Sequence, residues 1–303
     1  MDASSSAETH LLYILLDSNL PTGGFVASSG LESYTKHGFL GTTSNAGSIE
    51  GLVKFVQDSV RNYAASTGGF VRDTWRLVGQ VSKQLDANDP MDFIVDDVLR
   101  VDALYDAMTL NHVTRRSSTA QGIALLTLFS KAFADATPND DTEGQQKRLR
   151  GKRVIDRFKK LVRLGKTPGH LPICWGLLTS SAGLSLERTT HLHLFLHIRA
   201  ILSSAVRLNI IGPYAATNIL YTRLSGCLDE QVQACDSART GCLRKDLVED
   251  GDDLWAWARR AEEEVIGSTE TGSPAGWGPT MTWPLGETLM NRHDFQHTRI
   301  FNS

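Results

Sequence analysis

The stretch Ser48 to Tyr63, SIEGLVKFVQDSVRNY, carries the pattern that decides the fold class. Its apolar side chains recur at spacings of three and four: Leu52, Phe55, Val56, Val60 and Tyr63. This spacing places them on one face of a helix, and Ser48 ahead of them suits a helix N-cap. The pattern predicts an amphipathic helix over residues 48–68.

The same periodicity recurs along the chain, whereas β-branched alternation bounded by turn residues hardly occurs. We therefore expect an all-α protein, a single helical-bundle-like domain of about ten helices. A break is expected at Gly212-Pro213, because proline cannot donate to a helical carbonyl. The other helices are expected over residues 29–37, 70–85, 91–109, 115–134, 171–180, 186–211, 214–224 and 252–266.

Composition marks off the segments around this domain. Residues 1–10 are polar and expected to be disordered, and the all-α domain spans residues 11–266. Within it, residues 137–169 form a charged insertion, predicted to be a loop plus a basic helix with ten Lys or Arg between Lys147 and Lys166. Residues 267–303 begin with a stretch rich in Gly, Ser, Thr and Pro, typical of a flexible linker, and end in a segment expected to dock on a partner.

Composition also bounds the function. The 303 residues carry a formal net charge of -3 with 21% charged side chains, which is typical of a soluble globular protein and not of one that coats nucleic acid. No apolar run approaches the roughly 18 residues that span a bilayer, and no charged segment leads into a signal sequence, so a cytoplasmic location is expected. The four cysteines contain no Cys-x-x-Cys and predict neither disulfides nor a zinc site.

The glycine-rich stretch Leu20 to Phe39, LPTGGFVASSGLESYTKHGF, raises the possibility of a phosphate loop. Its glycines do not have the Gly-x-Gly-x-x-Gly spacing, and no Gly-Lys-Ser/Thr follows. We expect instead a turn with positive φ at Gly23 or Gly24, and close packing of helix on helix at Gly30.

The residues offer little for catalysis. His193 and His197 lie one turn apart and are weak candidates for a divalent metal, since two ligands leave a site incomplete. With His170 they define an alternative hypothesis, an all-α metalloenzyme or metal-binding protein. There is no Gly-x-Ser-x-Gly and no evident nucleophile. The basic helix could bind phosphates or an acidic partner, and the ending RHDFQHTRIFNS predicts an amphipathic end docked on its own core or on a partner.

Four stretches, in order over most of the chain, resemble the UreF family of urease accessory proteins. LPTGGFVASSGLE matches the amino-terminal block of the family, RRSSTAQGIALLTLF its middle helix, the run from GHLPICWGLL to AVRLNIIGP its central part, and RHDFQHTRIFNS its ending. Two departures lie in the ending, where Ile300 replaces the usual leucine and Asn302 the usual basic residue.

The resemblance implies an all-α adaptor that is not an enzyme. It would form a homodimer, join a UreD/UreH-type scaffold protein and a UreG-type GTPase on apo-urease, and act as a possible regulator of that GTPase. Neither nucleic acid nor membrane is an expected partner. No cofactor is expected to be bound permanently, and nickel would be handled by the complex.

The resemblance also places residues on partner-binding or dimer surfaces. Within this set Phe25 would be an apolar anchor, Glu32 an acceptor for a basic partner group, and Arg207 either an arginine finger or a residue paired inside the chain. Asn291–Ser303 would dock on the scaffold. The set is Pro21, Gly23, Gly24, Phe25, Gly30, Glu32, Arg116, His170, Arg207, Gly212, His293, Arg299, Phe301 and Ser303.

Overall fold

The structure is a computed structural model that describes residues 3–41, 45–80, 90–135, 142–243 and 278–302. Regular elements in these ranges are all helical, which confirms the all-α prediction. The expected helix over residues 252–266 and Ser303 lie outside them.

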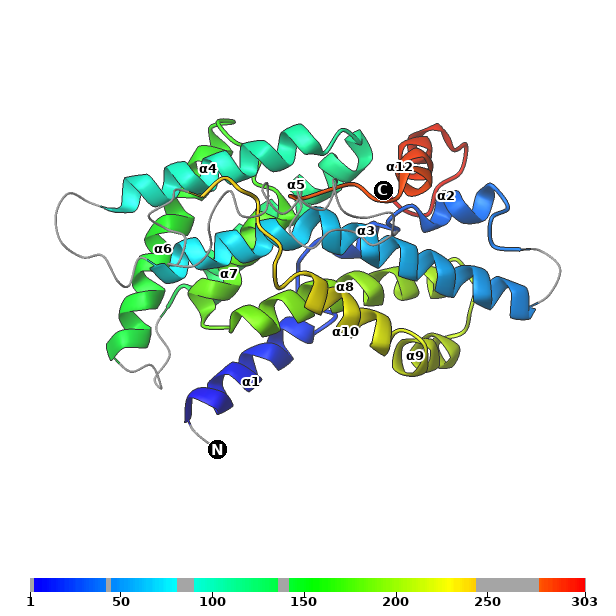
Figure 1. The fold of residues 1–303 in the computed structure, drawn as a ribbon, viewed down its shortest axis with the longest axis horizontal. Helices are drawn as coiled ribbons and strands as arrows, with labels where there is room; N and C mark the ends of the chain where they lie inside the picture. The colour runs from blue at the N-terminus through cyan, green and yellow to red at the C-terminus, as the bar shows by residue number, and fades with distance from the viewer. Residues whose placement is uncertain (1–2, 42–44, 81–89, 136–141, 244–277, 303) are drawn as a thin grey trace, which may run out of the picture.

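The helices pack around one another in a single elongated body (Figure 1). Their bounds are α1 Ala3–Leu16, α2 Leu31–Lys36, α3 Asn45–Gln80, α4 Pro90–Met108, α5 His112–Leu128, α6 Thr142–Arg163, α7 Leu171–Ala182, α8 Leu186–Arg207, α9 Pro213–Thr222, α10 Ser225–Ala234 and α12 Pro284–Asn291. A π-helical turn, η2, covers Phe129–Phe133, and short 3-10 turns cover Gly24–Val26 (η1) and Arg292–Phe295 (η4).

The break expected between residues 68 and 70 is wrong, because α3 runs unbroken through Gly68 and Gly69. Both glycines lie where the chain after α10 crosses the helix. A Cβ on Gly68 would lie 2.5 Å from the Cys235 sulfur, and one on Gly69 would lie 3.0 Å from the Arg239 carbonyl carbon. Glycine is used here for close approach, which offsets its low helix propensity.

The end expected for α8 at residue 211 is also wrong, because the helix ends at Arg207. Asn209 adopts a left-handed conformation with φ 57°. The N–H of Asn209 donates to the Val206 carbonyl and that of Ile210 to the Ala205 carbonyl, at 3.0 and 2.9 Å. This is the Schellman arrangement, in which asparagine can replace the usual glycine.

One further expectation is wrong, and the predicted basic helix corresponds to α6. Residues 3–10, expected to be disordered, belong to α1. The basic segment is a helix whose apolar side is part of the core, since Val154, Ile155 and Phe158 of α6 are fully buried. Its charged residues therefore belong to one side of an anchored helix.

The core consists of two hydrophobic clusters joined by the long helices. One cluster contains Phe70 and Leu77 of α3, and the other contains Leu52 and Phe55 of the same helix. Helix α8 likewise contributes Leu192 to the first cluster and Ile198 to the second. In the part of the chain that the structure describes, no helix is long and apolar enough to cross a membrane.

Candidate functional site

The glycine-rich stretch 20–30, here called the strap, crosses the molecule beside the end of the chain. Gly23 has φ 75° and Gly30 has φ 84°, which confirms a positive φ at the first Gly pair and assigns it to Gly23. A Cβ on Gly30 would lie 2.7 Å from Cγ of Met290 in α12. Close packing at Gly30 is thus confirmed.

Glu32 binds the end of the chain. Its buried carboxylate accepts the backbone N–H groups of Ile300 and Phe301 at 2.8 and 3.1 Å and pairs with Lys36 at 3.1 Å. Burial alone would raise the pKa of this carboxyl, but the two N–H donors and Lys36 outweigh it and lower the pKa. The expectation that Glu32 accepts a basic group of a partner is wrong for this conformation, because its oxygens are engaged within the chain.

Asp294 joins the same segment to α5. It accepts two parallel hydrogen bonds from Arg116, at 2.9 and 3.0 Å, and a further one from Arg299 at 2.7 Å. The hydrogen bonds from Arg116 lower the pKa of the Asp294 carboxyl, although partial burial opposes them. Arg116 also donates to the Asn302 carbonyl at 2.7 Å.

Arg207 lies between two aromatic rings, one from the strap and one from the chain end. Its guanidinium carbon is 3.9 Å from the centroid of Phe25 and 4.4 Å from that of Phe301. The same guanidinium donates to the Phe25 carbonyl, and the N–H of Asn302 donates to the Val26 carbonyl at 2.9 Å. Arg207 is therefore paired inside the chain, with a carbonyl of the strap and not with one at the Gly212 break. Gly212 lies directly before α9, and nothing lies within 4 Å of a Cβ built on it.

Three other residues expected on a surface are buried. His170 contacts Ser118 Oγ at 3.2 Å and Asp106 at 3.1 Å, and His293 contacts the Phe301 carbonyl at 3.0 Å. The Phe301 ring is only 3% exposed. These side chains hold the segments together and are covered by the chain itself.

What remains at the surface is a mixed apolar and cationic patch, which we call the clasp surface: Phe25, Val26, Arg116, Arg299 and Ile300. Phe25 is 70% exposed and Ile300 65% exposed. A hollow beside them is lined by Gly23, Val26, Arg116, Arg299 and Asn302, among others. Pro21 is exposed at the start of the strap, and a Cβ on Gly24 would lie 3.1 Å from Oε1 of Gln121 in α5.

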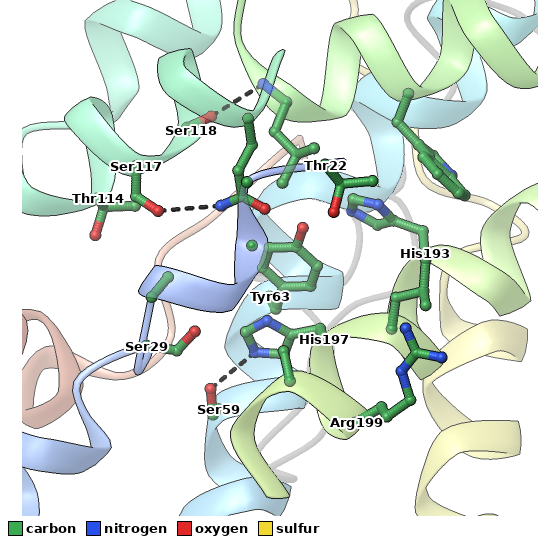
Figure 2. Close-up of a pocket in the computed structure, with 18 of the residues that line it drawn as sticks. Thr22, Ser29, Ser59, Tyr63, Thr114, Ser117, Ser118, His193, His197 and Arg199 are labelled. Carbon is green, nitrogen blue, oxygen red and sulfur yellow. Dashed lines mark hydrogen bonds between the residues drawn. The ribbon is translucent and has the colours of Figure 1, made fainter. Parts of the chain in front are cut away.

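Beneath the strap lies a cavity of about 290 Å³, lined by residues of α3, α5 and α8 (Figure 2). The Tyr63 ring lies between the imidazoles of His193 and His197, with centroid separations of 4.7 and 4.0 Å. Burial lowers the pKa of both histidines to about 3, so both are neutral at physiological pH.

Hydrogen bonding fixes one of these imidazoles. Thr67 Oγ1 donates its proton to the Tyr63 carbonyl at 2.6 Å, so it must accept from His193 Nε2, which lies 3.0 Å away. His197 Nε2 lies 3.0 Å from Ser59 Oγ. Among the described residues no group of three His, Cys, Asp or Glu could hold a metal ion. The pair alone gives the metalloenzyme alternative no geometric support.

Sequence reasoning did not identify the residues that anchor the chain end. Asn62 Oδ1 accepts the N–H groups of Thr282 and Trp283 at 2.7 and 3.1 Å. Asn111 caps α5 through Val113 N–H at 3.0 Å and donates to the Glu287 carbonyl at 3.0 Å. Only the Asn111 cap has a local sequence signal, an Asn ahead of a helix. The other contacts join residues more than 170 positions apart.

Comparison with known proteins identifies the family of this chain. The UreF family model matches residues 47–223. A curated relative from Cryptococcus neoformans var. grubii, Urease accessory protein 6, is 44% identical over 99% of this chain and 98% of its own length. Urease accessory protein F from Oryza sativa subsp. indica is 26% identical over 95% of this chain and 82% of its own. A UreF-like protein from Schizosaccharomyces pombe is 26% identical over 71% of this chain and 78% of its own length. The chain belongs to the UreF family of urease accessory proteins.

Proposed function

We propose that this chain is a non-catalytic adaptor that bridges a UreD/UreH-type scaffold protein and a UreG-type GTPase during assembly of the urease nickel centre. Family membership supports a role in urease maturation. The observation that carries the adaptor role is the clasp surface, where exposed apolar side chains lie among arginines held in place by hydrogen bonds.

The clasp surface has the composition of a protein-binding patch. Aromatic and arginine side chains are enriched at interface centres, and rigid side chains lose less conformational entropy on binding. Phe25 is stacked on Arg207, and Arg116 is held by Asp294, so both are ordered before any partner arrives. The scaffold protein is the partner we assign to this surface.

The remaining parts of the proposal concern the assembled complex. The chain would act there as a homodimer, bind no cofactor permanently and leave nickel to be handled by the complex. Any effect on the GTPase would come through the assembled surface, since the Arg207 guanidinium is engaged with Phe25 and Phe301.

The test replaces Phe25 with Asp and measures binding of the purified scaffold protein by calorimetry. Because a carboxylate would be desolvated at the interface centre, we expect affinity to fall at least about tenfold. Tyr13→Asp is the matched control, since Tyr13 is similarly exposed at 66% but lies on α1. Unchanged affinity of the Phe25→Asp chain, or equal losses in both variants, would remove the clasp surface as the binding site.

A further inference from the structure

Helix α6 has one side in the core and is therefore held rigidly. Val154, Ile155 and Phe158 are fully buried, and the helix packs against α4 and α7 (Figure 1). Gly151 lets the helix approach α7 closely, because a Cβ there would lie 2.2 Å from the Ser181 hydroxyl. The direction in which the opposite side faces is set by this packing.

That opposite side is strongly basic. Arg153, Lys160 and Arg163 are exposed, and their spacings of seven and three residues place them on one face about 15 Å long. Between Lys147 and Lys166 the sequence has ten Lys or Arg and a single acid, Asp156, although the whole chain carries a net charge of -3. Positive charge is thus concentrated on this helix.

Within the described part of the chain, Arg153, Lys160 and Arg163 make no ion pair, and the exposed Asp156 is the one acid of this stretch that shares their face. The neighbouring Lys159 is held by Ser130 Oγ at 2.9 Å. Burial first, and then the positive charges of Arg163 and Lys131, lower the pKa of the Lys159 ammonium, while Asp156 opposes them.

We propose that Arg153, Lys160 and Arg163, which we call the α6 basic face, form an electrostatic docking site for an acidic segment of a protein partner. A fixed row of cations of this length matches about three helical turns, or a short loop, carrying several carboxylates.

Two other classes of anionic partner fit less well. A membrane-surface helix inserts its apolar side between lipids, but that side of α6 is occupied by the core. Single-stranded nucleic acid is bound by cations together with aromatic stacking platforms, and the aromatic residue of α6, Phe158, is fully buried. Charge complementarity with an acidic polypeptide is what the face offers.

The test uses a fluorescent, glutamate-rich peptide of about twelve residues, long enough to cover the face as a helix. Binding is measured by anisotropy with the full chain and with the double variant Arg153→Glu/Lys160→Glu. The matched control is Lys54→Glu/Arg61→Glu, which reverses the same two residue types at the same spacing on α3, where both are exposed. Arg153→Lys/Lys160→Arg preserves the charge.

We expect the full chain to bind the peptide saturably, and the α6 charge reversal to weaken the affinity at least about tenfold. The control and the charge-preserving variant should keep the affinity within about twofold. Binding to the full chain should weaken as salt rises from about 0.05 to about 0.3 M. Absence of saturable peptide binding, or equal losses in both reversals, would overturn the proposal. Tighter binding of polyuridylate RNA or of phosphatidylserine vesicles, lost in the α6 reversal, would also overturn it, since the face would then serve another class of partner. The clasp surface is not involved, so this result is independent of scaffold binding.

Discussion

Single side chains connect parts of this molecule that are far apart in the sequence. Glu32 binds backbone groups of residues 300 and 301, and Arg207 joins Phe25 to Phe301. In both cases the charge is satisfied by neighbours from the chain itself. A charged side chain used in this way fixes the shape of the surface around it, where Phe25 and Ile300 stay exposed.

Replacing Glu32 with Gln is expected to lower the free energy of unfolding by about 1–3 kcal/mol, because one buried backbone N–H loses a charged acceptor. Urea denaturation at neutral pH measures this, with the exposed Glu230→Gln as control. Since the folded pKa of Glu32 lies below 4.5, its contribution is complete above that pH and is lost as pH falls through the folded pKa. A Gln variant as stable as the parent would show that the carboxylate does not stabilise the chain end.

The stacked histidines give a second pH dependence in a different window. Their folded pKa values of about 3 lie below 6.5, so the unfolded chain gains protons first as pH falls. Their stabilisation is fully present well above pH 6.5 and should decrease by about 2 kcal/mol for each histidine, about 4 kcal/mol for both, between about pH 7 and about pH 5. The slope, measured by urea denaturation, should flatten in His193→Gln/His197→Gln and persist in the exposed His10→Gln. An equally steep slope in the double variant would contradict the assignment.

At the scale of elements, the contact between α5 and the start of α7 depends on the absence of a side chain. A Cβ on Gly122 would lie 2.0 Å from the Gly169 carbonyl oxygen and 2.9 Å from the His170 carbonyl carbon. These are backbone atoms, and Asp102 fixes them by accepting the N–H groups of Gly169 and His170 at 2.8 and 2.9 Å. The two elements therefore cannot separate locally to make room.

Gly122→Ala should consequently destabilise the protein by about 2 kcal/mol or more, as overpacking does, despite the better helix propensity of alanine. Gly226→Ala on α10 is the matched control, because nothing lies within 4 Å of the added Cβ. That variant should be neutral or more stable by up to about 1 kcal/mol. Thermal unfolding of the two variants distinguishes the cases, and similar melting temperatures would show that the helix can shift to admit a methyl group.

Helices with local signals were predicted well. The apolar stripe of α3 and the Gly212-Pro213 start of α9 were predicted correctly because periodicity and proline act over a few residues. The false break at Gly68 and the late end of α8 have a different origin. A glycine within a helical pattern can mark either the end of the helix or a close contact with another segment. At Gly68 it marks a close contact, and the contacting segment, residues 235–239, is far away in the sequence. Asn209 could have marked the end of α8, since Asn tolerates the left-handed region.

At the scale of the whole molecule, the sequence predicted which residues belong to the candidate site but not how they are arranged. The resemblance grouped Phe25, Glu32, Arg116 and Arg207 with the chain ending, and the structure brings these residues together. It did not reveal which of them face outward. Burial of Glu32, His170 and His293 depends on packing between segments up to 269 residues apart, which no local pattern encodes. The exposed apolar side chains of this region are Phe25, Val26 and Ile300.

The long helices should make the described fold one cooperative unit. Helix α3 places Leu52 and Phe55 in one hydrophobic cluster and Phe70 and Leu77 in the other, and α8 spans both clusters. Loss of either cluster would expose the apolar side of a helix that the other still needs, so partly unfolded states should be unfavourable.

We therefore expect a single urea transition. Its midpoint by circular dichroism should match the midpoints of hydrogen exchange in peptides covering residues 52–60 and 70–78, which report the two ends of α3 separately. Deleting residues 291–303 removes the buried Phe301 ring and the backbone N–H groups that donate to Glu32, so the common midpoint should move to a lower urea concentration. The helical signal of the native state should be nearly unchanged, because α12 loses only its last residue. Two separate midpoints in the full chain would show that the two hydrophobic clusters unfold independently. The stability of the strap and the chain end would then not depend on the cluster that contains residues of α4, α6 and α7.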